Sequence, residues 1–269
     1  MSQKYRSPFL NSIYETMARQ RYAPRTIQAY IQWIRRFILF HNKQHPDSLG
    51  IPEIEAGNDL AAMISEAAGG DGLVDDDIVV VTHKVVSKAE GAVATIVDEQ
   101  QYRELVLDQA AAVLRRRGDL VITETPHGFV CANAGVDRSN AAPGTAVLLP
   151  DDPDRSAHGL RQNLERLTGA RLGVIITDTF GRAWRTGLVD VAIGISGVTS
   201  VLDLKGEADA MGREMEVTEI AVADEIAAAA DLAMGKATGI PVAVVRGLRL
   251  GDDGRGTDLI RHPSEDLFR

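Results

Sequence analysis

The 269-residue sequence contains a single cysteine, Cys131, and no apolar run long enough to cross a lipid bilayer. One cysteine excludes an intrachain disulfide and the zinc sites that are built from several thiolates. A membrane-spanning helix needs about 20 consecutive apolar residues, and residues 1–22 lack the apolar centre of a signal peptide. We therefore expect a cytoplasmic globular protein in which Cys131 is a small buried hydrophobic residue.

Glycine and acidic residues are scarce at the start of the chain, and this scarcity marks a boundary. Residues 1–50 contain only one of the 25 glycines, and eight Lys/Arg against two Asp/Glu. The rest of the chain contains 21 Lys/Arg against 36 Asp/Glu, whereas eight of the thirteen aromatic residues lie in the first 50. Such a break in composition indicates two segments of different origin. We predict a basic head at 1–48 and an acidic body at 51–269.

The head has the pattern of two helices. Ser7-Pro8 is a predicted helix start, because Ser caps free N–H groups and Pro suits the first helical position. A second helix is predicted over 24–41 by apolar residues at helical spacing. The segment FLNSIYETMARQRYAPRTIQAYIQWIRRFILFHNKQHP resembles the start of the core-binding domain of integron-type tyrosine recombinases.

The resemblance to recombinases does not include the residues that catalyse recombination. Such enzymes need a nucleophilic tyrosine in a separate C-terminal domain, and Tyr102 is the only tyrosine beyond residue 50. A helical appendage acquired by gene fusion is therefore favoured over DNA recombination. We expect the basic head to bind nucleic acid only weakly and nonspecifically.

The body alternates between short β-branched apolar runs and helical patterns, which predicts an α/β fold. The alanine-rich helix EIAVADEIAAAADLAM indicates that another element approaches its backbone closely. Buried strands are predicted at 78–81, 120–122, 146–149, 174–176 and 242–245, and helices at 58–68, 99–117, 156–168 and 219–234.

Polar residues follow three of the predicted strands, in IVVVTHK, LVITET and VIITDT. Open α/β sheets bind ligands at the carboxyl ends of their strands. A single Thr or Asp at such a position is explained as well by the start of the next turn or helix. Three together favour a functional site.

The segment NAGVDRSN, residues 133–140, is a second candidate. Gly135 permits a close approach of the backbone, so that Asp137 and Asn140 can face one point. Asp137 and Asp178 have no sequence-adjacent His or Cys, and their oxygen ligands suit Mg²⁺ or Mn²⁺ rather than zinc. The GxxxxGK[ST] nucleotide loop is missing. These patterns predict a metal-dependent α/β enzyme, with phosphate chemistry left open.

A more specific hypothesis comes from six segments that run in order through the body. They are IPEIEAGNDLA, DIVVVTHKVVSKAEG, VITETPHGFVCANAGVDRSN, VIITDTFGRAWRTGLVDVAIG, MGREMEVTEIAVADEIAAAADLAMGK and PVAVVRGL. Together they resemble the coenzyme F420-0:L-glutamate ligase family. The resemblance implies a mixed-sheet α/β ligase fold, a homodimer, and GTP-dependent addition of L-glutamate to F420-0 through an acyl phosphate. It also implies Mg²⁺ or Mn²⁺ and a monovalent cation, K⁺.

The family's site residues transfer to matching positions of this chain. The resemblance implies that Asp137 and Asp178 bind metal and that Thr179 is a hydroxyl ligand of a second metal ion. From residue type, we add Arg182 and Arg185 as catalytic cations that offset phosphate charge, with surface or dimer ion pairs as an equal alternative. The implied GTP-binding residues are Ile51, Pro52, Glu53, Ile54, His83, Lys88, Asn140, Met234, Gly235, Lys236, Ala237 and Thr238.

Lys236 departs from the family pattern. Some members have Glu or Gln at this position, which is implicated in the second metal, and a protonated amine cannot be a metal ligand. Direct phosphate binding by Lys236 is the alternative. Pro126 replaces a frequent basic residue, and the head replaces the short strand that precedes residue 51 in relatives. A DNA-binding fusion protein with an inactive ligase body and a metal-dependent phosphohydrolase remain as alternative functions.

Overall fold

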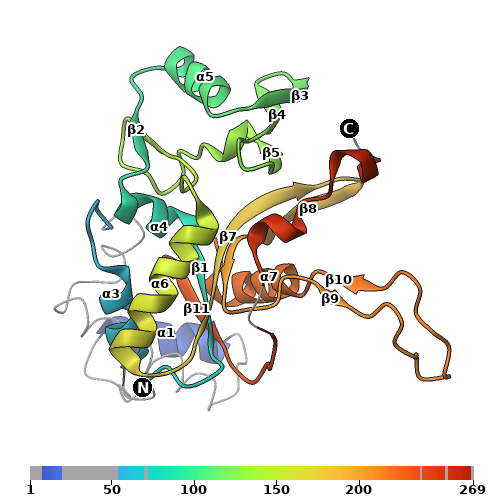
Figure 1. Cartoon of the computed structure of the whole chain (residues 1–269). Coiled ribbons are helices and arrows are strands. Elements are labelled where there is room, and N and C mark those ends of the chain that lie inside the picture. The colour runs from blue at the N-terminus through green and yellow to red at the C-terminus, as the bar shows by residue number, and fades with distance from the viewer. Residues whose placement is uncertain (1–7, 20–53, 70–71, 237, 252–253, 268–269) are drawn as a thin grey trace.

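The computed structural model describes residues 8–19, 54–69, 72–236, 238–251 and 254–267 (Figure 1). Its framework is a four-stranded mixed sheet with the strand order β11-β1-β7-β8. None of the helices in these ranges is long and apolar enough to cross a membrane. The mixed α/β architecture confirms the predicted fold class.

Two parallel strands form the centre of the sheet. β1 (Ile78–Thr82) pairs with β7 (Gly173–Arg182) in a register that runs from Ile78 opposite Gly173 to Thr82 opposite Thr177. On the outer sides, β11 (Val242–Val245) and β8 (Arg185–Ser196) are antiparallel to β1 and β7. The sheet is therefore mixed, as predicted.

Helices cover both faces of the central strands. Val79 and Val81 belong to a core shared with α3 (Leu60–Ala68) and α6 (Pro153–Thr168), whereas Ile78 and Val80 belong to a core shared with α7 (Val222–Met234). Figure 1 shows α3 and α6 on one side of β1 and β7, and α7 on the other. Because both faces are buried, these strands need continuous apolar sequences rather than alternating ones.

The alanine-rich helix α7 packs closely on the sheet, as predicted. Ala223 and Ala227 are completely buried, and Ala230 is almost so. The Asp224 carboxylate accepts a hydrogen bond from the backbone N–H of Ala192 in β8, at 2.9 Å. Small side chains on this face let the helix backbone approach the strand.

A smaller region stands beside the main sheet. It consists of α5 (Glu99–Asp108) and a three-stranded antiparallel sheet of β3 (Ala112–Arg117), β4 (Leu120–Glu124) and β5 (Val130–Ala132). A further antiparallel pair joins it to the main sheet, formed by β2 (Val93–Thr95) and β6 (Thr145–Val147). In Figure 1 this region lies above the sheet.

Several predicted boundaries were wrong. The predicted helix 99–117 ends at Asp108, and its second half is β3, a largely exposed strand that pairs with β4. The arginine run in this segment lacks the alternation of apolar and polar residues that predicts a strand. Pairing with β4 therefore determines its structure, rather than local propensity. The predicted helix 219–234 begins at Val222 because Glu219–Ile220 forms β10, which pairs with β9 (Leu202–Asp203).

Further elements of the body were not predicted, and one predicted helix of the head lies outside the residues that the structure describes. The helix α4 (His83–Glu90) and the long strand β8 were both missed. In the head, α1 (Pro8–Arg19) confirms the predicted first helix. The predicted second helix, 24–41, lies outside the described residues.

A substitution at Gly194 in β8 tests how closely α6 packs on the sheet. A Cβ added there would lie 2.3 Å from the Pro153 carbonyl oxygen, at the start of α6. We expect Gly194→Ala to lower the free energy of unfolding by about 1–3 kcal/mol, because backbone on both sides must move. Urea denaturation measures this loss.

The matched control is Gly159→Ala. Gly159 lies within α6, and an added Cβ there has no heavy atom within 4 Å. This variant should gain roughly 0.5–1 kcal/mol, because alanine favours the helical backbone. Equal stability changes in the two variants would show that α6 does not constrain β8.

Candidate functional site

The parallel register of β1 and β7 brings His83 beside Asp178. Each residue directly follows the paired Thr82 and Thr177, and His83 Nε2 lies 3.3 Å from Asp178 Oδ1. The His83 side chain is 0% exposed and that of Asp178 is 12% exposed. The other ring nitrogen, Nδ1, lies 3.3 Å from the Ser87 hydroxyl one helical turn later. The polar residues that follow two of the three predicted strands therefore meet, whereas those of LVITET lie in or directly after β4 of the separate three-stranded sheet.

The strand that contains Asp178 does not end there, contrary to the prediction that it spans only 174–176. β7 continues to Arg182, and its pairing with β8 shifts register between Ile176 and Thr177. The shift leaves Ile193 of β8 as an extra residue between Ala192 and Gly194. Asp178 therefore projects from the middle of a long strand, immediately after an irregularity in the pairing.

Asp178 is held as a carboxylate. Burial raises its pKa, but the nearby His83, the Thr179 N–H bond at 2.7 Å and the charge of Lys84 together lower the pKa below its usual value. A carboxylate that is stabilised in this way stays ionised at neutral pH. It is thus available to an incoming cation.

The Asp137 segment begins with a strained turn. Asn133, Ala134 and Gly135 have positive φ angles of 51°, 53° and 70°. A Cβ on Gly135 would lie 2.6 Å from Leu149 Cγ, which confirms the predicted close approach of the backbone. The Ala134 N–H donates to the Thr123 hydroxyl at 2.8 Å. Positive φ is costly for alanine, so the surrounding contacts must fix this turn.

Lys84 links Asp137 to Asp178. Its Nζ lies 2.8 Å from Asp137 Oδ2, and its charge also acts on Asp178. Burial raises the pKa of Asp137, but Lys84 and the N–H and hydroxyl of Ser139 bring it below the usual value. Lys84 is thus in contact with one predicted metal-binding carboxylate, Asp137, and acts through its charge on the other, Asp178.

Helix α4 provides a further contact with the Asp137 segment. Lys88 is 6% exposed, and its Nζ donates to the Asn140 carbonyl at 2.5 Å. Asn140 has a φ of 54°, which directs the backbone of this turn. Lys84 and Lys88 lie on one face of the helix, since residues four positions apart are neighbours. Two predicted GTP-binding residues, Lys88 and Asn140, are therefore in contact.

Thr179 has a different set of partners. Its hydroxyl donates to Asp190 Oδ1 at 2.5 Å across the β7–β8 pairing, and Lys236 Nζ donates to the same hydroxyl. Lys236 Nζ also lies 3.1 Å from Asp190 Oδ1. The position predicted to bind a second metal ion thus contains an ammonium group.

The other predicted nucleotide-binding residues lie in two segments. Ile54 packs against the main core, and the Gly57 N–H donates to the Ala89 carbonyl of α4 at 2.8 Å. Met234 ends α7, Gly235 follows it with a φ of 65°, and the Thr238 hydroxyl donates to the Met234 carbonyl. Ile51, Pro52, Glu53 and Ala237 lie outside the described residues.

Arg182 and Arg185 are not gathered with the carboxylates. They face each other at the end of the β7–β8 pairing, and Arg182 donates to the Thr186 carbonyl at 2.7 Å. Asp178 is four residues from Arg182 along β7, or roughly 13 Å in an extended strand. Figure 1 shows this hairpin extending away from the helices. The catalytic role of the two arginines stays a prediction.

Comparison with known proteins identifies the body. A model described as F420-0:Gamma-glutamyl ligase matches residues 48–247. The chain is 41% identical over 242 residues to the coenzyme F420:L-glutamate ligase of Methanothermobacter thermautotrophicus, covering 82% of this chain and 96% of the relative. It is 42% identical over 239 residues to the enzyme of the same name from Methanopyrus kandleri, covering 81% and 94%. The chain belongs to the F420-0:gamma-glutamyl ligase family.

The head of this family member matches a different group. A model described as Phage integrase, N-terminal SAM-like domain, matches residues 9–56. The resemblance of the head to recombinases and the resemblance of the body to the ligase family are therefore both confirmed.

Two residues of the candidate site, Lys84 and Asp190, were not predicted from the sequence. Asp190 interrupts the apolar run LVDVAIG, and it is only 4% exposed. A carboxylate inside an apolar strand needs a partner. The acidic residue within the apolar run LVDVAIG therefore indicated, from the sequence alone, that Asp190 has a partner.

The donor groups fit one divalent cation better than two. Asp137 and Asp178 are oxygen donors of the kind that binds Mg²⁺ together with substrate phosphates and water, and an ion there would share the Asp137 carboxylate with Lys84, which lies 2.8 Å from its Oδ2. Among the described residues, no three His, Cys, Asp or Glu side chains form a metal site by themselves. The remaining ligands of an ion held by Asp137 and Asp178 would be phosphate oxygens of a substrate and water. The Thr179 position does not fit a second divalent cation while Lys236 lies against it.

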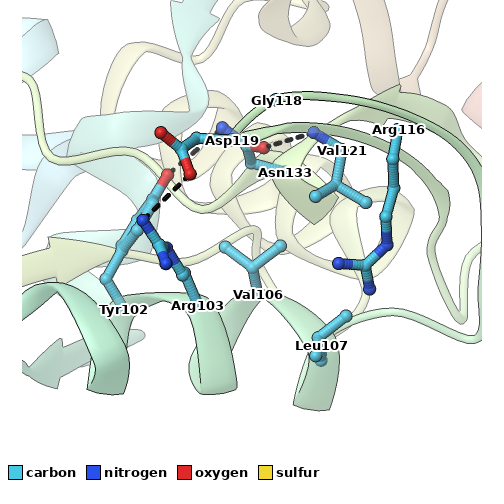
Figure 2. A pocket seen from close by; sticks show the side chains of 9 residues that line it. All are labelled: Tyr102, Arg103, Val106, Leu107, Arg116, Gly118, Asp119, Val121 and Asn133. Atoms are coloured by element: carbon cyan, nitrogen blue, oxygen red, sulfur yellow. Dashed lines mark hydrogen bonds and ion pairs between the residues drawn. The ribbon is translucent and has the colours of Figure 1, made fainter.

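A cavity of about 190 Å³ in the smaller region is separate from these carboxylates. Figure 2 shows Arg103 paired with Asp119 on one side and Arg116 on the other. Asn133 links the cavity to the turn before Asp137, and its amide accepts a hydrogen bond from the Val121 N–H. The lining residues are Tyr102, Arg103, Val106, Leu107, Arg116, Gly118, Asp119, Val121 and Asn133. None of the predicted site residues is among them.

Cys131 provides a chemical test of the packing beside the site. It is buried, as predicted, and burial, with the negative charge of Asp178, raises the pKa of its thiol to about 12. At pH 8 almost none of it is thiolate, so the folded protein should not react with a disulfide reagent such as DTNB. One thiol per chain should react after denaturation. Rapid reaction of the folded protein at pH 8 would contradict this packing.

Proposed function

We propose that this protein is a GTP-dependent ligase that joins L-glutamate to F420-0 through an amide bond. The proposal rests on two carboxylates whose pKa values are lowered, Asp137 and Asp178, and on Lys84 at the start of α4, which pairs with the first and acts through its charge on the second. It is supported by the names of the relatives, which are coenzyme F420:L-glutamate ligases and align with 94–96% of their own lengths.

The chemistry requires an activated acyl group, because a free carboxylate is a poor acyl donor. In the proposed reaction, a carboxylate oxygen of F420-0 attacks the γ-phosphorus of GTP, and GDP leaves. The glutamate amine then attacks the acyl carbon of the resulting acyl phosphate. Inorganic phosphate leaves, and the amine loses a proton as the amide forms. Both steps bring anionic groups together, so positioning and charge compensation are the main tasks of the protein.

The residues of the site can perform these tasks. Asp137 and Asp178 would hold Mg²⁺ or Mn²⁺, which when bound compensates the charge of the transferred phosphoryl group. Lys84 and Lys88 add positive charge along α4, while His83 fixes the orientation of Asp178. The buried surroundings strengthen these interactions because water screens them less. We also propose GTP binding by the Ile54 and Met234 segments, and K⁺ as a monovalent cation.

We further propose that the ligase acts as a homodimer. Large apolar side chains are exposed on two projecting hairpins: Trp184 is 86% exposed and Leu188 69% on β7–β8, and Met211 is 85% and Val217 82% between β9 and β10. Figure 1 shows both hairpins extending from the sheet. Exposed apolar side chains mark an association surface where they gather in one patch, and we propose that these four do so in the dimer. A second copy of the chain is the proposed partner.

The proposed reaction is tested with the full chain, GTP, Mn²⁺, L-glutamate and F420-0. Mass spectrometry should show glutamyl-F420, and omission of the divalent ion should abolish it. Asp178→Asn should reduce turnover by a factor of a hundred or more, on the order expected when a group that compensates transition-state charge is lost. Asp108→Asn, at the exposed end of α5, should leave turnover unchanged.

Three outcomes would contradict the proposal. Near-normal turnover of a folded Asp178→Asn variant would remove Asp178 from the site. Phosphate release that needs neither F420-0 nor glutamate would favour a phosphohydrolase. Absence of any reaction, together with tight DNA binding by the full chain, would favour the fusion protein with an inactive ligase body.

A further inference from the structure

Asp190 is a buried carboxylate whose partners include a lysine from another part of the chain. It projects from β8 and is 4% exposed. Thr177 Oγ1 donates to its Oδ2 at 3.2 Å, and Thr179 Oγ1 donates to its Oδ1 at 2.5 Å. Hydroxyl donors do not neutralise its charge. A buried charge without a counter-charge is expensive, so a cation is required here.

Lys236 provides that cation. It follows Gly235, the residue that caps the C-terminus of α7, and its Nζ lies 3.1 Å from Asp190 Oδ1. Asp231 of α7 lies on its other side, with Oδ1 3.9 Å from Nζ. The ammonium group also donates to the Thr179 hydroxyl. The ammonium group thus contacts oxygens of β7, β8 and α7, although the side chain as a whole is 54% exposed.

The same oxygens are suited to a divalent ion. Carboxylate and hydroxyl oxygens are the hard ligands that Mg²⁺ and Mn²⁺ prefer. An ammonium group and a divalent ion cannot occupy one position, because they repel each other and compete for the same oxygens. The side chain of Lys236 therefore decides whether this position can bind a metal ion.

We propose that Thr179 and Asp190 form a cation subsite that Lys236 fills with its own ammonium group. The protein then binds divalent metal at Asp137 and Asp178 and not at Thr179. The inference rests on the proposed ligase site for its context, but it concerns metal binding to the free protein. Its test therefore measures bound metal rather than turnover, so the two proposals can fail separately.

The test is a titration of the full chain with Mn²⁺ in the absence of nucleotide, with unbound Mn²⁺ measured by electron paramagnetic resonance. Lys236→Gln removes the ammonium group and adds an amide oxygen, so it should bind an additional Mn²⁺ per chain compared with the unaltered protein. Lys236→Arg is the matched control, since it keeps a cation at the same position. It should bind no additional ion.

The origin of the additional site is tested with Asp190→Asn. Combined with Lys236→Gln, this substitution should remove the gained Mn²⁺, and in the otherwise unaltered protein it should leave the amount of bound Mn²⁺ unchanged. Equal Mn²⁺ binding by Lys236→Gln and the unaltered protein would overturn the proposal. A loss of bound Mn²⁺ on Asp190→Asn alone would also overturn it, and this comparison needs no variant of Lys236.

Discussion

The parallel pairing of β1 with β7 determines the geometry of the candidate site. The register that sets Thr82 opposite Thr177 also sets His83 beside Asp178. Because the chain turns into α4 directly at His83, the same register carries Lys84 and Lys88 toward the Asp137 segment. A shift by one residue would move every side chain of β7 to the opposite face. The apolar cores on both sides of the sheet prevent such a shift.

Charge compensation is the second organising feature of the site. Asp137 pairs with Lys84 and Asp190 pairs with Lys236, while Asp178 lies beside the His83 ring and is acted on by the charge of Lys84. Buried ion pairs seldom stabilise a fold more than apolar packing of the same volume. A buried carboxylate, Asp77, also pairs with Arg246 at the other end of β1. The groups around the start of α4 differ in that several carboxylates and cations gather there, which favours a ligand site.

Local sequence patterns predicted the central elements well. The β-branched runs at 78–81 and 174–176 correspond to β1 and the start of β7, and the alanine-rich pattern corresponds to α7. The contacts that define the site depend on pairing between distant segments, which no local pattern contains. His83 lies beside Asp178 only because of the β1–β7 register, which joins residues almost a hundred positions apart in the sequence.

A crystal structure of the full chain with a non-hydrolysable GTP analogue and Mn²⁺ would test most directly whether these residues form one nucleotide site. We expect the phosphate groups beside Lys88 and the start of α4, with Mn²⁺ between Asp137 and Asp178. A nucleotide bound instead in the cavity lined by Tyr102 and Arg116, with no ion on Asp178, would contradict the assignment of the site.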